Sequence, residues 1–150
     1  MSGRRTRTIC AVSLMAVLAP AAVGCSDHGG TPSSEVSRAS AAIASARASA
    51  QAELDKIKGG SQAKREVKVG RVRRDGAGRA VAPLTVTNRA KHPAGYAIEV
   101  NFRDASGHLV DAVVLRLSKV PPNQPTPATA RSHRKLTGHI TANVGTALRY

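Results

Sequence analysis

The sequence has very few aromatic residues: two tyrosines, one phenylalanine and no tryptophan in 150 residues. Proteins that bind single-stranded nucleic acid stack its bases on aromatic side chains, so this shortage argues against a nucleic-acid partner. A hydrophobic core must therefore be built mainly from Val, Leu, Ile and Ala. Such a core is small, and we expect its stability to be modest.

Acidic residues are absent from residues 1–8, which carry three arginines, and charge of either sign is absent from residues 9–24. A basic start followed by a short apolar run and small residues is typical of a secretory signal peptide. A membrane-spanning helix needs roughly 20 apolar residues, and this run is shorter. We therefore predict a signal peptide over residues 1–24 rather than a retained membrane span.

Two cleavage sites are open at the end of this segment. Residues 19–21, Ala-Pro-Ala, fit the small-x-small pattern of ordinary signal peptidase. Residues 22–25, Ala-Val-Gly-Cys, resemble the lipobox of bacterial lipoproteins, in which the cysteine is lipidated and becomes the first mature residue. The resemblance implies that Cys25 is a lipidation site whose acyl chains anchor the protein on the membrane.

Cysteine is also scarce, since only Cys10 and Cys25 are present. Removal of residues 1–24 takes Cys10 away, so the mature chain cannot form an intramolecular disulfide. A single cysteine in an exported protein is unusual unless it has a specific function, and lipidation would be such a function. The alternative is a secreted protein in which Cys25 is a free or dimer-forming thiol.

Acidic residues number nine against 23 Lys and Arg. Three of the bases lie in residues 1–8, which leaves 20 bases and a net charge of +11 after residue 24. Such a surplus favours anionic partners. For an exported protein these are anionic lipid headgroups or acidic cell-wall polymers. A genome rich in Arg and Ala codons is the alternative explanation.

Two polar segments follow the predicted signal peptide. Residues 25–34 are rich in Gly, Ser and Pro and predict a flexible tether. Residues 35–60 are rich in Ala, the best helix former, and end in two glycines. We expect an Ala-rich helical spacer, in which a helix over residues 35–58 would be about 36 Å long if fully formed. A thin apolar repeat every seven residues leaves pairing with another helix open.

From about residue 66 the apolar pattern changes from a helical period to a period of two. The clearest strand is residues 96–102, in which apolar and other side chains alternate. Residues 109–117 are apolar on both faces, as in a central strand. Six or seven short strands separated by turns predict a mainly β fold, a small antiparallel β-sandwich over residues 61–150. The other expected strands cover residues 66–74, 82–87, 126–134 and 140–150.

The segment YAIEVNFRDASGHLVDAVVLRLSKVPPNQ, residues 96–124, resembles the FxLYD-type domain of bacterial envelope proteins. Val100, Phe102 and Asp104 occupy the strand-end positions of that family's pattern. VTN at residues 86–88 is similar to the residues that end an earlier strand of the family. The resemblance implies an immunoglobulin-like sandwich in an envelope lipoprotein, and it implies no particular activity.

The sequence contains no recognisable catalytic or metal-binding motif. The five histidines form no H-x-x-x-H or H-E-x-x-H pattern, and neither G-x-S-x-G nor a phosphate loop is present. Asp104 and Asp111 flank one turn, where we expect Asp104 to accept backbone hydrogen bonds rather than to pair for acid–base chemistry. We therefore expect no enzyme, no cofactor and no metal. The alternative is an enzyme whose site is assembled from distant residues.

Two basic clusters are the best candidates for a binding site. GRVRRDGAGR, residues 70–79, is typical of a hairpin tip, because a phosphate cradle would have to open a helix. RSHRK, residues 131–135, is the second cluster. If the two clusters share one face they form an anion-binding patch; otherwise they are solvated ends. The candidate residues are Arg71, Arg73, Arg74, Arg79, Arg131, Arg134 and Lys135.

Together these features predict a lipid-anchored envelope protein on the extracytoplasmic face of the cell membrane. Its β-sandwich would be a non-catalytic binding or scaffolding module. The expected partners are the membrane through Cys25, anionic headgroups or cell-wall polymers, and another envelope protein. The alternative is a secreted basic protein, not lipidated, that binds polyanions or inhibits an enzyme.

Overall fold

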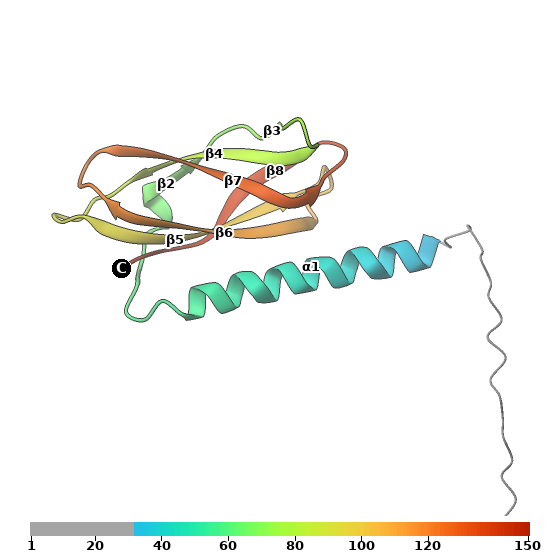
Figure 1. Cartoon of the computed structure of the whole chain (residues 1–150), viewed down its shortest axis with the longest axis horizontal. Coiled ribbons are helices and arrows are strands. Elements are labelled where there is room, and N and C mark those ends of the chain that lie inside the picture. Colours follow the sequence, from blue (N-terminus) through green and yellow to red (C-terminus); the bar gives the residue numbers. More distant parts are fainter. Residues whose placement is uncertain (1–31) are drawn as a thin grey trace, which may run out of the picture. The chain divides into compact units, whose positions relative to one another are not determined.

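A computed structural model describes residues 32–150 of the chain (Figure 1). The predicted signal peptide, Cys25 and most of the predicted tether lie outside the described residues. The described part contains one α-helix and two antiparallel four-stranded sheets, which confirms the mainly β sandwich. Its elements are α1 (Pro32–Asp55), β1 (Ser61–Gln62), the 3-10 helix η1 (Lys64–Glu66), β2 (Val67–Val69), β3 (Arg73–Arg74), β4 (Arg79–Thr87), β5 (Ala94–Arg103), β6 (Leu109–Val120), β7 (Pro125–Lys135) and β8 (Thr141–Arg149).

Hydrogen-bonded neighbours assign each strand to one of the two sheets. The first, which we call the β5 sheet, has the order β1-β8-β5-β6. In the second, the β4 sheet, β4 pairs with β7 on one side and with both β2 and β3 on the other. The predicted strand at residues 66–74 is therefore two short strands, since the ladder is interrupted after Val69.

Alternation along the strands builds the core between the two sheets. Tyr96, Ile98, Val100 and Phe102 of β5 are fully buried, and every second residue of β4 from Ala80 to Val86 is also buried. Because successive side chains of a strand point to opposite faces, these residues form one apolar layer from each sheet. The predicted core strand at 96–102 is confirmed.

Helix α1 packs on the outer face of the β5 sheet, mainly against β6 (Figure 1). Ala50 and Leu54 in its second half are each only 4% exposed. The Arg116 side chain on β6 lies 2.7 Å from the Glu53 carboxylate. The second half of the helix therefore belongs to the packed unit, which a spacer standing clear of the domain would not do. Within residues 32–150, no helix combines the length and the apolar character that crossing a membrane requires.

The bounds of α1 differ from the prediction at both ends. The helix begins at Pro32, three residues earlier than expected, so the end of the predicted tether is helical. Proline suits the first turn of a helix, where its missing N–H has no partner to lose. The helix ends at Asp55, before the glycines, because the amide of Ile57 bonds back to the Leu54 carbonyl in a tight turn.

A buried asparagine ties the end of β4 to the end of β6. The Asn88 side chain is fully buried and donates to the carbonyls of Val120, at 2.8 Å, and His92, at 2.9 Å. Its oxygen accepts the amide of Ala90 at 2.9 Å. Asn88 is the residue that ends VTN in the sequence, so this motif holds together the loop that follows β4.

We predict that Asn88→Ala destabilises the protein by about 2 to 4 kcal/mol, because buried carbonyls lose their donors. The measurement is urea unfolding followed by circular dichroism. Asn143→Ala, which truncates an exposed asparagine on β8, is the matched control and should shift the free energy of unfolding by less than about 0.5 kcal/mol. Equal effects of the two substitutions would contradict a structural role for Asn88.

Candidate functional site

The pairings of β4 bring the two basic clusters onto one sheet face. The residues of β4 are alternately buried and half-buried, and Val81 belongs to the set that faces away from the core. Arg73 pairs with Val81 from one side, and Arg131 pairs with Val81 from the other. Arg79 pairs with Lys135. Directly paired residues project from the same side of a sheet, so these four bases share the outer face of the β4 sheet.

Lys68 adds a fifth base to this face. It pairs with Thr85 of β4, another outward-facing residue, and it is exposed. Sequence reasoning missed it, although the order Val67-Lys68-Val69 places the lysine opposite two core valines. We call the resulting surface the basic face; it consists of Lys68, Arg73, Arg79, Arg131 and Lys135.

One carboxylate lies at the edge of the basic face. Asp75 accepts the amides of Ala77 and Arg79, each at 2.9 Å, and so closes the predicted turn. The Arg79 amide is the largest influence on the carboxyl group and lowers the pKa of Asp75, against a rise from burial. Its other oxygen lies 2.6 Å from the guanidinium of Arg131. Asp75 therefore offsets part of the charge of the face.

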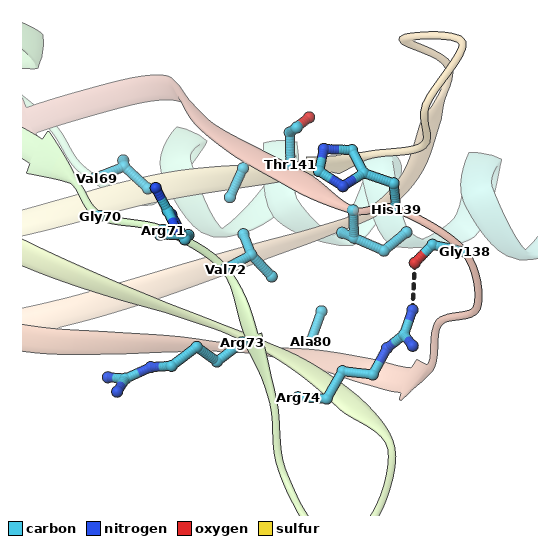
Figure 2. A pocket seen from close by; sticks show the side chains of 12 residues that line it. Val69, Gly70, Arg71, Val72, Arg73, Arg74, Ala80, Gly138, His139 and Thr141 are labelled. Carbon is cyan, nitrogen blue, oxygen red and sulfur yellow. Dashed lines mark hydrogen bonds between the residues drawn. The ribbon is translucent and has the colours of Figure 1, made fainter.

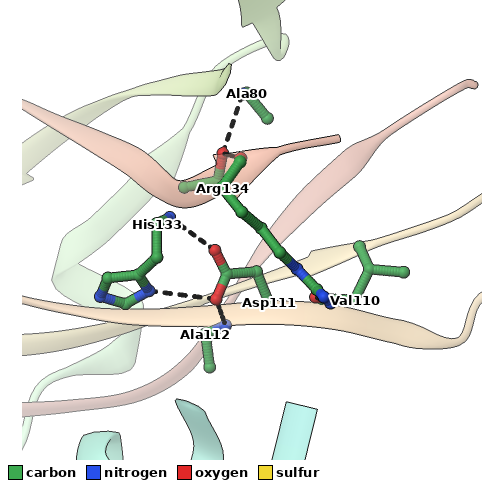
Figure 3. A network of polar contacts seen from close by, with 7 residues as sticks. Ala80, Val110, Asp111, Ala112, His133 and Arg134 are labelled. Carbon is green, nitrogen blue, oxygen red and sulfur yellow. Dashed lines mark hydrogen bonds and ion pairs between the residues drawn. The ribbon is translucent and has the colours of Figure 1, made fainter. Parts of the chain in front are cut away.

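Two of the seven predicted patch residues lie outside the basic face, and their side chains donate hydrogen bonds to backbone carbonyls elsewhere. Arg74 pairs with the buried Ala80 and donates to the carbonyl of Gly138 (Figure 2). Arg134 donates to the Val110 carbonyl at 2.6 Å (Figure 3). The side chains of Arg73 and Arg74 leave β3 in opposite directions (Figure 2). The predicted patch is thus divided between two surfaces.

A groove of about 640 Å³ lies between the segment 69–74 and the start of β8 (Figure 2). Val69, Val72 and Ile140 supply apolar surface to it, and all three also pack against the core. Exposed bases stand around these residues. We call this the β3–β8 groove, and its basic lining residues are Arg71, Arg73, Arg74 and His139.

A buried carboxylate joins the two sheets at the edge formed by β6 and β7. Asp111 on β6 is 2% exposed and accepts the backbone amide of His133 on β7 at 2.7 Å (Figure 3). Its second oxygen accepts the Ala112 amide at 2.9 Å and lies 3.1 Å from the His133 ring. Two of these contacts reach His133, so Asp111 ties β6 to β7.

Asp104 occupies the turn position that the sequence predicts. It accepts the amides of Ser106 and His108, each at 2.9 Å, in the turn between β5 and β6. Burial acts to raise the pKa of Asp104, but the hydrogen bonds outweigh it and the pKa is lowered. It forms no pair with Asp111. In residues 32–150, no cluster of three or more His, Cys, Asp and Glu residues could hold a metal ion.

Comparison of the chain with protein-family models, with curated proteins and with solved structures finds no match in any of the three. The fold and the geometry of its surfaces are therefore the basis for any functional argument.

Among the described residues, Tyr96 has the largest pKa shift. It is fully buried, and its hydroxyl donates to the Glu66 carboxylate and lies 3.2 Å from the oxygen of Asn88. Glu66 is also paired with Arg149. Burial, and then the adjacent carboxylate, raise the pKa of Tyr96 to about 12.

This shift predicts that the protein loses stability in alkali. The pKa of a tyrosine in an unfolded chain is about 10, and in the fold it is higher, so neutral Tyr96 stabilises the fold below about pH 10 and this contribution is lost between about pH 10 and 12. The chain has only two tyrosines and no tryptophan. The ultraviolet absorbance of Tyr150→Phe therefore reports Tyr96 alone, and we expect its ionisation near pH 12. Ionisation near pH 10 in protein that circular dichroism shows to be folded would contradict the buried contact.

Proposed function

We propose that the chain is a lipid-anchored protein of the extracytoplasmic envelope, whose β-sandwich is a non-catalytic module that binds anionic surfaces. The observation that carries this proposal is the basic face. It sets five bases on one sheet surface, and among the described residues only Arg131 of the five is in an ion pair. The other four charges are available to an anionic partner.

The two sheet faces support different tasks. The outer face of the β5 sheet is covered by α1 over β6 and part of β5, whereas the outer face of the β4 sheet carries the bases. This second face is an open strand surface with long side chains, which suits contact with an extended anionic surface rather than with one small molecule. Anionic lipid headgroups and acidic cell-wall polymers have that form.

The binding energy expected of the basic face favours a role in which it acts together with a membrane anchor. A base near an anionic membrane surface contributes about 1 kcal/mol, and this contribution falls within a Debye length. Acyl chains at Cys25 would supply stable attachment, and the basic face would then set the orientation of the domain or hold it near a polymer.

We also propose that the sandwich is an FxLYD-type domain. Three observations support the resemblance. Val100 and Phe102 are fully buried in β5, and Asp104 closes the turn after that strand. Asn88, at the end of VTN, is a fully buried structural residue.

The anchor predicts a particular mass. Protein purified from a bacterial membrane fraction should begin at Cys25 and carry a diacylglyceryl adduct, and Cys25→Ala should be released from the membrane. Intact mass spectrometry and fractionation measure both. A mature chain that begins at Ala22 with a free thiol would contradict lipidation and favour the secreted alternative.

The basic face predicts salt-sensitive binding to anionic vesicles. We expect Arg79→Gln, Arg131→Gln and Lys135→Gln together to weaken binding of the Cys25→Ala chain to phosphatidylglycerol vesicles about a hundredfold at low salt. Sedimentation with vesicles measures this, and phosphatidylcholine vesicles provide the uncharged comparison.

The matched control removes three exposed bases elsewhere: Arg38→Gln, Lys91→Gln and Lys119→Gln. Both triple variants lose the same net charge, so equal losses of binding would show that total charge, not the basic face, is responsible. Retention of the unsubstituted chain on teichoic acid but not on vesicles would assign the face to cell-wall polymers.

A further inference from the structure

We propose that the β3–β8 groove binds an extended acidic peptide segment, which adds as a strand to the free edge of β8. Of the bases that line this site, only Arg73 also belongs to the basic face, and the inference does not depend on the proposed anchor or on binding to anionic surfaces.

The outer edge of β8 is open over most of its length. On one side β8 pairs with β5, and on the other β1 covers only Leu148 and Arg149. One more bond joins the amide of Ala63 to the carbonyl of Ala147. Residues 141–146 have no second strand in the described part of the chain, which leaves an edge about 20 Å long.

The first half of this edge, residues 141–144, lacks the features that usually protect free strands; the register of β8 against β5 shifts only further on, between Val144 and Ala147. Residues 141–147, TANVGTA, contain no charged side chain and no proline. Proteins commonly guard an exposed edge with charges, prolines or bulges. The other two long edge strands have such guards: β6 carries Arg116 and Lys119, and β7 carries Pro125 and Pro127. An unguarded edge of this kind is a template for strand addition.

The surface beside this edge is apolar. Val69, Val72 and Ile140 line the β3–β8 groove. A second hollow of about 320 Å³ continues along the same strand, and it shares Val69 and Ala142 with the first. The side chains of an added strand alternate between its two faces, so one set would pack against these apolar residues.

The basic charge of the groove favours acidic residues at the alternate positions of an added strand, those that do not pack on the apolar surface. Lys64, Arg71, Arg73, Arg74 and His139 line the two hollows, and neither hollow is lined by an acidic residue. Arg74 is held by the carbonyl of Gly138, whereas Arg71 and His139 make no hydrogen bond or ion pair within residues 32–150. The occupant that complements this surface is therefore a segment in which Asp or Glu alternates with apolar residues.

A second copy of the chain fits this edge less well. Pairing of β8 with β8 would bring the bases around one groove towards those around the other, and like charges brought together cost binding energy. A polyanion without apolar groups would leave the apolar surface of the groove in water.

The test uses the full chain with Cys25→Ala and a heptapeptide that alternates Glu and Val. Isothermal titration measures its affinity, and amide hydrogen exchange by NMR reports the β8 edge. We expect binding, with slower exchange of amides within residues 141–146. Arg71→Glu should weaken the peptide about fivefold. Lys68→Glu, an equal charge change on the outer face of the same sheet, should weaken it less than about twofold.

Two comparison peptides decide the mode of binding. A heptapeptide of Glu alone and a heptapeptide that alternates Lys and Val should both bind more weakly than the Glu-Val peptide. Equal affinity for the all-Glu peptide, or unchanged exchange of the β8 amides, would overturn strand addition. A dimer in analytical ultracentrifugation that the Glu-Val peptide fails to dissociate would also overturn it, because a second copy would then occupy the edge.

Discussion

The register between β4 and β7 is the constraint on which the surfaces of this protein depend. It pairs Val81 with Arg131 and Ala82 with Ala130, so that bases and core residues leave the sheet on opposite sides. A slip of one residue would exchange the two sets and would place a guanidinium among the core side chains. Burial of an unpaired charge is far more costly than the loss of a few apolar contacts. The demand for an apolar interior therefore also fixes which bases face the solvent together.

Much of this arrangement is local and can be predicted from the sequence. Alternation identified β5, and the Asp75 turn and the two basic clusters were visible as short motifs. The partition of the clusters was not, because it depends on pairings between distant segments. Arg73 and Arg74 are neighbours in the chain, yet only the ladder to β4 decides which one faces outwards. The tie from Asp111 to His133 spans 22 residues and has no local signal.

The packing of α1 was also hidden from sequence reasoning. Its apolar stripe is thin, and the least exposed side chains of the helix include Ala46 and Ala50 beside Leu54. Small side chains bury little area each, but they allow a helix to approach a sheet closely. Ala97 and Ala112, which are almost fully buried although their strands' core residues lie on the other side, show that the sheet offers an equally smooth surface. Composition alone cannot distinguish such a contact from an exposed spacer, because both favour alanine.

The distribution of polar groups explains how a small core without tryptophan can still hold two surfaces in place. Buried side chains form hydrogen bonds with backbone groups of other strands: Asn88 donates to the Val120 carbonyl of β6, and Asp111 accepts the His133 amide of β7. Such contacts add little net stability, but their geometry is strict, and an unmade bond is costly. They therefore fix the relative positions of strands that aliphatic packing alone would leave adjustable. The solvent-exposed bases can then be held at constant spacing without contributing to the stability of the fold, and their total charge remains free to act on a partner.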